Sequence, residues 1–350
     1  MSRRILVTGG GGFLGRRIVE MLMAQGDRVR VFCRGSYPDL VASGAEVVSG
    51  DLRDGKAVAG ACAGMDAVCH VAAIAGIWGR REDFHHINVR GTANVLGGCL
   101  AQKVFALLYT SSPSVAIGDQ DIMGGDESLP YPRKYLADYP ATKASAERMV
   151  LDADGWEMVS NTLEPLPEAG GVRRLRTCSL RPHLIYGPRD PHLIPRLLDA
   201  ARAGRLRRVG SGHNLVDVTH VDNAAQAHVQ ALDELLGSAR CGGKAYFIGD
   251  AEPVNLWDWI GRLLDELGLP PPRRAVPFRL AYAMGAALEL LHRLFPRLGE
   301  PRMTRFLAVQ FARSHYFDHS QAKEDFGYDP RLTGPDAWAS LVKWCKEDGK

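Results

Sequence analysis

Tyr139 and Lys143 lie four residues apart in the stretch DYPATKASAERM, which has the pattern of an amphipathic helix. Residues four apart share one face of a helix, so the phenol and the ammonium group should be neighbours. A free tyrosine has a pKa of about 10, too high for easy proton exchange near neutral pH. A nearby positive charge stabilises the phenolate and lowers that pKa. The pair therefore predicts a tyrosine that donates a proton to a carbonyl group as the carbonyl receives a hydride.

A run of hydroxyl side chains follows the apolar residues in the segment LLYTSSPSV. Binding sites of parallel α/β sheets form at the carboxyl ends of strands, so these hydroxyl groups should reach the same site as Tyr139. We expect Ser112 to form a hydrogen bond with the substrate oxygen and to hold it against the phenol. Ser111 or Ser114 could take this role instead.

A glycine-rich loop follows the first predicted strand. In VTGGGGFLG, Gly9, Gly12 and Gly15 have the spacing GxxGxxG. The first glycine allows a tight turn, the second lets the backbone approach a pyrophosphate, and the third lets helix and strand pack closely. The free N–H groups of the helix that starts near Phe13 and Leu14 favour phosphate binding. The loop therefore predicts a dinucleotide cofactor.

The tip of the second predicted strand indicates which dinucleotide binds. An NAD site would have a carboxylate there for the ribose 2′-hydroxyl, but this chain has Arg34. An arginine can pair with a 2′-phosphate, so we expect NADP(H) to be favoured over NAD(H); a solvated surface arginine is the alternative. Asp51, followed by Leu52, is a candidate partner for the adenine amino group. Ala72 and Ala73 are small enough for the cofactor to lie across the fourth strand.

These residues need a fold that brings strand ends together. The first half of the chain alternates short apolar strands with amphipathic helices, which is typical of a parallel sheet covered on both faces. Strands are expected at residues 4–9, 28–34, 45–51, 66–73, 105–112 and 176–182, and helices at residues 13–25, 55–63, 89–101 and 139–151. We therefore expect an α/β fold with a Rossmann-type doubly wound parallel sheet.

The second half is less regular and predicts a smaller, mostly helical C-terminal substrate lobe. We expect an NADP-binding domain at residues 1–182, to which residues 213–250 return, and a substrate-binding lobe at residues 183–212 and 251–350. Helices are expected at residues 193–203, 223–235 and 256–267, and a strand at residues 243–250. The polar stretch at residues 156–171 is rich in Glu and Pro and is expected to be a surface excursion.

Composition restricts the class of protein. A net charge of +3 over 350 residues argues against general nucleic-acid binding. The 7 cysteines are scattered without a CxxC pair, so neither a metal site nor a disulfide framework is predicted. The N-terminal residues enter a strand without a signal-peptide region, which together with the cysteines predicts a cytoplasmic protein.

The segment at residues 278–295 is apolar and helical in pattern. It contains Arg279, Glu289, His292 and Arg293, whereas a membrane-spanning helix needs about 20 mostly uncharged residues. We expect a helix that faces the core or a partner, with contact to a lipid surface as the alternative.

Taken together, the motifs resemble those of the extended short-chain dehydrogenases/reductases. The resemblance rests on the glycine loop, HVAA, INVRGT, YTSSPSV, YPATK, RPHLIYGPRD, VDVTHVDNAAQAH and KEDFGYDP, so it covers nearly the whole chain. It implies that Tyr139 is the acid/base, Lys143 its partner and Ser112 the anchor of the substrate oxygen. It also implies that Asn88 supports a proton relay, although Asn88 could instead cap a helix.

The resemblance also implies where the nicotinamide lies and how chains associate. Pro182, Leu184 and Ile185 would run beside the nicotinamide ring, whereas His183 is expected to pack. Helices at residues 89–101 and 140–152 resemble the family's dimer face, so a homodimer is expected. Association with other enzymes of a pathway is a further option.

Within this family, the stretches AAIAGIWG, GKAYFIGDAEPVNLWDWI and GEPRMTRFLAVQF are similar to the 3β-hydroxysteroid dehydrogenase branch and to its bacterial members in long-chain olefin biosynthesis. This similarity implies reduction by NADPH of the 3-keto group of a long-chain 2-alkyl-3-oxoalkanoic acid to a 2-alkyl-3-hydroxyalkanoic acid. Trp78, Ser114 and Tyr186 are the candidates for contact with this β-keto acid.

Three alternatives stay open. The same chemistry run as an oxidation would make the chain a 3β-hydroxysteroid or sterol dehydrogenase. A sugar-nucleotide epimerase or dehydratase needs a diphosphate clamp and often further acid/base residues beside the serine, and Pro113 and Ser114 offer none. A non-catalytic NADP-sensing regulator tends to lose the tyrosine and lysine that this chain keeps.

Overall fold

The computed structural model describes residues 2–158, 174–272, 274–332 and 334–347. Most of the predicted excursion at residues 156–171 lies outside the described residues. Glu157 lies just before residues 159–173 and Arg174 just after them. These two residues pair through the backbone and through an ion pair of 3.2 Å.

A 7-stranded sheet in the order β12-β7-β5-β4-β1-β2-β3 forms the centre of the molecule, and all its neighbouring strands are parallel. The predicted Rossmann-type fold class is confirmed. The strands are β1 (Arg4–Thr8), β2 (Arg28–Cys33), β3 (Glu46–Ser49), β4 (Ala67–His70), β5 (Ala106–Thr110), β7 (Arg176–Pro182) and β12 (Lys244–Ile248).

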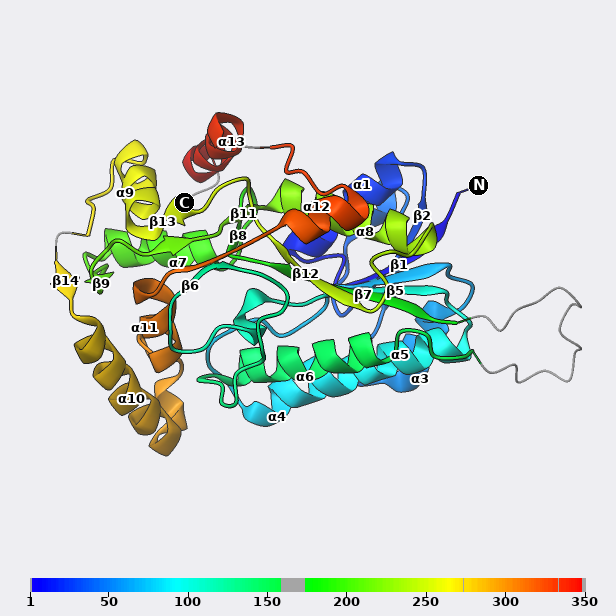
Figure 1. The fold of residues 1–350 in the computed structure, drawn as a ribbon, viewed down its shortest axis with the longest axis horizontal. Coiled ribbons are helices and arrows are strands. Elements are labelled where there is room, and N and C mark those ends of the chain that lie inside the picture. Colours follow the sequence, from blue (N-terminus) through cyan, green and yellow to red (C-terminus); the bar gives the residue numbers. More distant parts are fainter. Residues whose placement is uncertain (1, 159–173, 273, 333, 348–350) are drawn as a thin grey trace, which may run out of the picture.

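Helices cover both faces of this sheet, and for this reason the central strands are apolar throughout. Every residue of β4 and β5 is buried, as expected for a parallel strand between two helical layers. One face packs against α1 (Phe13–Ala24) and α8 (Val221–Leu236). The other face packs against α3 (Gly55–Cys62), α5 (Gly91–Ala101) and α6 (Asp138–Asp152), as Figure 1 shows.

The strand order reverses between β1 and β4. From β1 the chain proceeds outward to β2 and β3, and then returns to add β4, β5, β7 and β12 on the other side. Val7 of β1 is thus paired with Val31 on one side and Cys69 on the other. The loops after β1 and β4 leave in opposite directions, which opens a crevice at the carboxyl ends of these strands.

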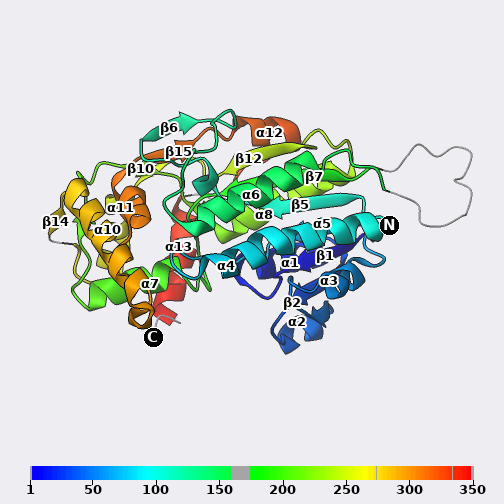
Figure 2. The same ribbon diagram turned by 90° about the horizontal axis from the view of Figure 1, so that it is seen from below.

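A second, mostly helical layer lies at one end of the sheet, as Figures 1 and 2 show. It has its own apolar core, which includes Leu198, Ile260, Leu263 and Leu341. Its helices are α7 (Leu193–Arg202), α9 (Leu256–Glu266), α10 (Phe278–Leu294), α11 (Arg305–Ala312) and α13 (Gly334–Glu347). No helix within the described ranges has both the length and the apolar character needed to cross a membrane.

Short strands connect this layer to the sheet. Four of them form one small sheet, and the others form two pairs, β8 with β11 and β9 with β14. These strands have two to four residues, too few to show a hydrophobic period, so the sequence did not predict them. The small-sheet strands are β6 (Ile122–Gly125), β10 (Leu215–Val216), β13 (Val254–Asn255) and β15 (His315–Phe317); the paired strands are β8 (Ile185–Tyr186), β9 (Arg208–Val209), β11 (Thr219–His220) and β14 (Ala275–Val276).

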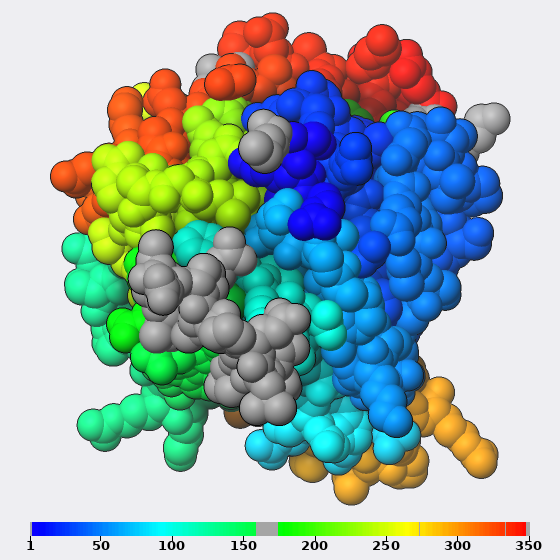
Figure 3. Space-filling view, turned by 90° about the vertical axis from the view of Figure 1, so that its right-hand side faces the viewer, coloured from blue at the N-terminus to red at the C-terminus, as the bar shows by residue number. Residues whose placement is uncertain are grey.

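The remaining elements are short: α2 (Pro38–Ala42), α4 (Arg81–Phe84), the π-helical turn η1 (His85–Arg90), the 3₁₀ turns η2 (Pro113–Val115) and η3 (Pro296–Leu298), and α12 (Ser320–Phe326). Segments from the two halves of the chain meet at the end of the sheet that faces the viewer in Figure 3, where α8 lies beside the N-terminal residues. An ion pair between Arg3 and Asp233 joins them there.

Candidate active site

The glycine loop after β1 is packed too tightly for side chains. Gly9 adopts a left-handed backbone conformation with a φ of 71°, and a Cβ atom there would lie 2.9 Å from the Cα of Ala72. A Cβ on Gly15 would lie 2.3 Å from the carbonyl oxygen of Gly9, so the first turn of α1 rests directly on the loop. Gly12 precedes α1 and brings no side chain over its N-terminus. These contacts fit a cradle for the pyrophosphate of a dinucleotide.

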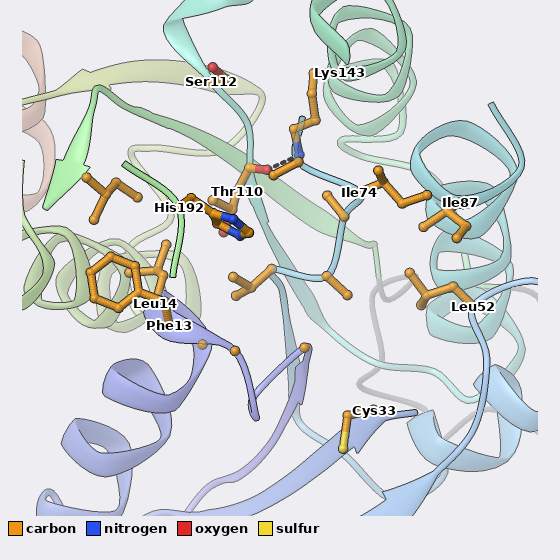
Figure 4. Close-up of a pocket in the computed structure, with 18 of the residues that line it drawn as sticks. Phe13, Leu14, Cys33, Leu52, Ile74, Ile87, Thr110, Ser112, Lys143 and His192 are labelled. Carbon is orange, nitrogen blue, oxygen red and sulfur yellow. Dashed lines mark hydrogen bonds between the residues drawn. The ribbon is translucent and has the colours of Figure 1, made fainter. Parts of the chain in front are cut away.

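A cavity of about 570 Å³ crosses the carboxyl ends of the strands, within the usual size range of ligand sites. In Figure 4, Cys33 lies at one end of the cavity and Ser112 and Lys143 at the opposite end. The lining includes every residue that the sequence analysis assigned to the cofactor: Gly9, Gly12, Phe13, Leu14, Gly15, Arg34, Asp51, Leu52, Ala72, Ala73, Tyr139, Lys143, Pro182, Leu184 and Ile185.

The end of the cavity near β2 carries opposite charges. Arg34 is exposed at the tip of β2, at the position where a 2′-phosphate was predicted. Asp51 forms an ion pair of 2.7 Å with Arg53, which lowers the pKa of the Asp51 carboxyl, and the charge of Arg34 adds a smaller contribution in the same direction. This end therefore offers a cation beside a carboxylate that keeps its negative charge.

Tyr37 lines the same end, and the sequence analysis missed it. A Cβ on Gly11 would lie 2.1 Å from the Tyr37 ring, so the ring lies directly on the glycine loop. The only signal in the sequence is an aromatic residue just after the tip of β2, which is too common to single out.

Tyr139 is the second residue of α6 and lines the cavity. Burial raises the pKa of its hydroxyl group, and a hydrogen bond with Ser112 lowers it by a smaller amount. The Ser112 hydroxyl also lies 2.8 Å from the hydroxyl of Ser114. The phenol thus has a hydroxyl partner at the wall where a substrate oxygen would be held.

Of the three candidate serines, Ser112 lines the cavity and has a hydroxyl group that lowers the pKa of Tyr139. Ser111 also lines the cavity, but its hydroxyl group is buried beside the Glu147 carboxyl and helps to lower the pKa of that group. Ser114 is buried behind Ser112 and does not line the cavity. These positions favour Ser112 over Ser111 and Ser114, and its role as the anchor of the substrate oxygen stays a prediction.

Lys143 is buried, and its Nζ donates a hydrogen bond of 2.5 Å to the carbonyl oxygen of Thr110. Nζ also lies 4.2 Å from the centre of the Tyr109 ring. Burial lowers the pKa of Lys143 to about 7, although the charge of Glu147 raises it in part. The sequence analysis expected Lys143 to lower the pKa of Tyr139. This expectation is wrong here: burial raises the pKa of Tyr139, and the contribution that lowers it in part comes from Ser112 and not from Lys143.

Glu147 continues the row of Tyr139 and Lys143 by one more turn of α6, and the sequence analysis missed it. Its side chain is 0% exposed and accepts hydrogen bonds from Arg181 at 2.7 and 3.0 Å. Burial raises the pKa of Glu147, but the charge and hydrogen bonds of Arg181 lower it by more, so the carboxyl stays ionised. Ser179 and Tyr131 complete the shell with hydrogen bonds of 2.9 and 2.7 Å.

Asn88 is buried inside the π-helical turn η1 and does not cap a helix, so the alternative reading of this residue is wrong. Its side-chain oxygen accepts a hydrogen bond from the backbone N–H of Ile74. Its amide nitrogen donates to the carbonyl oxygen of Ile74 and to the hydroxyl of Thr142 on α6. Asn88 thus fixes the loop after β4 to α6, and its part in a proton relay stays a prediction.

The predicted substrate residues do not reach the large cavity. Trp78 lines a separate cavity of about 70 Å³ and packs against His292 and Arg293 of α10, with the ring of His292 at 6.2 Å. Tyr186 lies in the core of the second layer, where its hydroxyl donates a hydrogen bond of 3.0 Å to Asp250. Their roles toward a substrate remain predictions.

The start of α7 contributes lining residues that the sequence analysis missed, namely Asp190, His192 and Leu193. The Asp190 carboxylate accepts hydrogen bonds from the backbone N–H groups of residues 192, 193 and 194 at 2.8, 3.1 and 2.8 Å. A negative charge of the protein therefore already caps this helix, which leaves fewer free donors for a diphosphate. His183, expected to pack, is buried against His315 with a nitrogen–nitrogen distance of 2.6 Å.

Comparison with known proteins places the chain in a family of oxidoreductases. A family model described as the 3-beta hydroxysteroid dehydrogenase/isomerase family matches residues 6–280. A relative from Shewanella oneidensis, named 2-alkyl-3-oxoalkanoate reductase, is 47% identical over 92% of this chain and 81% of its own length. A protein of the same name from Stenotrophomonas maltophilia is 44% identical over 94% and 96%. The Mus musculus sterol-4-alpha-carboxylate 3-dehydrogenase, decarboxylating, is 34% identical over 98% and 91%.

Solved structures show the same fold. The crystal structure of gox2253 superposes with a TM-score of 0.74 at 26% identity, covering 99% of both chains. MoeE5 in complex with UDP-glucuronic acid and NAD superposes with a TM-score of 0.71 at 25% identity, also covering 99% of both chains.

Proposed function

Because the chain belongs to the 3-beta hydroxysteroid dehydrogenase/isomerase family, we propose that it reduces the 3-keto group of a long-chain 2-alkyl-3-oxoalkanoic acid with NADPH. The product would be the 2-alkyl-3-hydroxyalkanoic acid, an intermediate suited to long-chain olefin synthesis. The chain is an NAD(P)-dependent oxidoreductase, and relatives at 47% and 44% identity carry the name 2-alkyl-3-oxoalkanoate reductase.

One observation carries the reaction type. Ser112, Tyr139 and Lys143 line the same cavity as the glycine loop, so a proton donor and a nucleotide cradle share one site. A hydride transfer that ends in an alcohol needs both a nicotinamide and a proton source at the carbonyl oxygen.

The residues at the end of β5 and the start of α6 have separate roles at the carbonyl group of the substrate. Ser112 holds the substrate oxygen by a hydrogen bond, and Tyr139 donates its proton to that oxygen. The ammonium group of Lys143 stabilises the negative charge that develops there. When bound, NADPH supplies the hydride for the substrate's C3. The glycine loop and the N-terminus of α1 would hold its pyrophosphate, and Pro182, Leu184 and Ile185 would lie beside its nicotinamide.

The preference for NADPH over NADH rests on Arg34. This residue lines the cavity at the tip of β2, where a carboxylate would be needed to favour a ribose 2′-hydroxyl. A guanidinium group can form two parallel hydrogen bonds with a 2′-phosphate, and it has no acceptor for a hydroxyl group.

A sterol-type dehydrogenase is the second candidate, supported by the mouse relative at 34% identity. The names of the two kinds of relative share a chemical feature, because each substrate carries a carboxylate on the carbon next to the reacting C–O group. Both substrates are also large and apolar. The two proposals therefore predict a β-keto or β-hydroxy acid and differ in the shape of the apolar part and in the direction of reaction.

The test is an assay of the purified protein with NADPH in parallel wells. The substrates are a long-chain 2-alkyl-3-oxoalkanoic acid, a 3-ketosteroid with a 4α-carboxylate and a nucleotide-linked keto sugar. The oxidation of NADPH is followed over a range of concentrations of each substrate. We expect the β-keto acid to have the highest kcat/KM. A higher value for the ketosteroid would support the sterol-type alternative, and turnover of the sugar nucleotide alone would contradict both.

A further inference from the structure

The outward face of α10 is apolar. Leu280, Met284, Leu291 and Leu294 follow one another at helical spacing, and they are 53%, 43%, 42% and 66% exposed. Contiguous exposed leucines of this kind are unusual for a surface in contact with water alone. We call this set the α10 surface, and it also includes Leu290, Phe295 and Leu298.

The opposite face of α10 packs against α11 and the residue before it. The helix is therefore held in place with its apolar row facing outward. A Cβ on Gly285 would lie 2.6 Å from the carbonyl carbon of Thr304, which leads into α11. Glu289 is buried and forms an ion pair of 2.7 Å with Arg305 of α11. Figures 1 and 2 show α10 at the outer margin of the molecule, with α11 on its inner side.

Positive charges flank the α10 surface. Arg279, Arg293, Arg297 and Arg302 are all exposed along or just after the helix. The carboxylates between residues 278 and 302 are already neutralised: Glu289 by Arg305 and Glu300 by Arg196, at 3.0 Å. The surface thus combines a broad apolar stripe with a cationic margin.

We propose that the α10 surface docks on a lipid bilayer that contains anionic headgroups. An apolar helix face that lies in the plane of the membrane buries its leucines among the acyl chains, while arginines at its margin reach the phosphates. Electrostatic attraction to anionic lipid adds to the apolar term. A second copy of the chain fits less well, because a symmetric interface would bring the arginines of two α10 helices together.

The helix α10 lies near the site, but through residues that do not belong to the α10 surface. Glu289 and Arg293 line the small cavity that also contains Asp138, the residue before Tyr139. If the proposed function holds, docking would bring the wall that carries Tyr139 close to the membrane in which a long-chain substrate dissolves. The docking itself rests on the apolar and cationic residues of α10 and does not depend on the substrate.

The test measures cosedimentation of the full chain with vesicles of phosphatidylcholine, with and without phosphatidylglycerol. We expect binding to vesicles that contain phosphatidylglycerol and weaker binding as salt is raised. The double variant Leu291→Asp/Leu294→Asp should weaken binding by at least about tenfold for each leucine. Arg297→Glu/Arg302→Glu should remove the preference for phosphatidylglycerol. Met123→Asp, at a residue of β6 that is 69% exposed, is the matched control and should bind like the parent.

Three outcomes would overturn the proposal. They are no binding to either vesicle, equal binding by the leucine variant and the Met123→Asp control, and dissociation of an oligomer by the leucine variant in light scattering without lipid. Thermal unfolding verifies that each variant is folded. Turnover of a short, water-soluble β-keto acid should be unchanged in the α10 variants. If the parent binds vesicles but reduces no β-keto acid, the proposed function fails and the docking surface stands.

Discussion

Lys143 donates its hydrogen bond of 2.5 Å to the carbonyl oxygen of Thr110, the last residue of β5 (Figure 4). This bond fastens α6, which carries Tyr139, to the strand that leads into Ser112. Loss of the amine would leave a buried carbonyl oxygen without its partner, which costs about 1–3 kcal/mol. Lys143 is therefore placed to hold the geometry of the site as well as to supply a charge.

Activity should fall as the pH rises through about 7. Burial lowers the pKa of Lys143 to about 7, so the ammonium form is present below that pH and is lost above it. A neutral amine cannot stabilise the negative charge that develops on the substrate oxygen. We expect kcat/KM for NADPH, which reports ionisations of the free enzyme, to be constant in mild acid and to decrease above about pH 7. A constant value up to about pH 9 would contradict the assignment.

The same group gives stability the opposite pH dependence. An unfolded lysine has a pKa of about 10.4, so between about pH 7 and 10.4 the unfolded chain binds more protons at this position than the native protein. The unfavourable contribution of Lys143 is therefore complete below about pH 7 and disappears as the pH rises toward 10.4. The free energy of unfolding of the parent, measured relative to Lys143→Met, should increase over that interval. This comparison separates the buried lysine from the other titrating groups.

Tyr139→Phe should lower kcat by about 10²–10⁴-fold, because the variant keeps the ring but has no proton to donate. Cofactor binding, measured by quenching of protein fluorescence with NADPH, should stay within a few-fold. Tyr316→Phe, on β15 and outside the cavity lining, is the control and should leave kcat unchanged. An unchanged kcat in Tyr139→Phe would remove Tyr139 from the mechanism.

Ser112→Ala should lower kcat by about 10²–10³-fold, the usual cost of losing one donor to a developing oxyanion. Because the hydrogen bond from Ser112 lowers the pKa of Tyr139, the variant should also shift the rising limb of the oxidation rate to higher pH. Ser114→Ala is the matched comparison, since Ser114 contacts Ser112 without lining the cavity. A larger loss in Ser114→Ala than in Ser112→Ala would reassign the anchor.

The sheet and the cofactor cavity could be predicted from the sequence because their signals are local. β7 spans the predicted residues, Arg176–Pro182, and α1 ends one residue before the predicted end, at Ala24. Glycine spacing after a strand and hydroxyl groups at a strand end then define one edge of the sheet. Parallel topology brings those ends together without further information.

The contacts that determine charge in the site could not be predicted in this way. Glu147 and Arg181, which form hydrogen bonds with each other, are 34 residues apart in the sequence. Lys143 and Thr110, which are also joined by a hydrogen bond, are 33 residues apart. The spacing of Tyr139 and Lys143 predicted a shared helix face but not the direction of a flexible lysine side chain. Burial of the phenol, which reverses the expected shift of its pKa, is a property of the complete fold and not of the helix that carries Tyr139.

Arg34→Ala should raise the KM for NADPH far more than the KM for NADH, because only NADPH loses an ionic partner at its 2′-phosphate. Arg28→Ala is the control, since Arg28 is exposed at the other end of β2 and outside the cavity lining. Steady-state kinetics with each coenzyme at saturating substrate provide both KM values. An equal rise for the two coenzymes would show that Arg34 does not distinguish them.

Glu147→Gln should destabilise the protein by about 3–5 kcal/mol, because Arg181 would keep its charge in a buried place without a counter-charge. The free energy of unfolding in urea measures this loss. Glu147→Gln/Arg181→Met should recover part of the stability, since it removes both charges, and a double variant as unstable as the sum of the single variants would contradict the pairing. The charge of Glu147 also raises the pKa of Lys143, so the variant should lose activity at a lower pH than the parent. A purely structural role for Glu147 would lower stability and leave the pH profile in place.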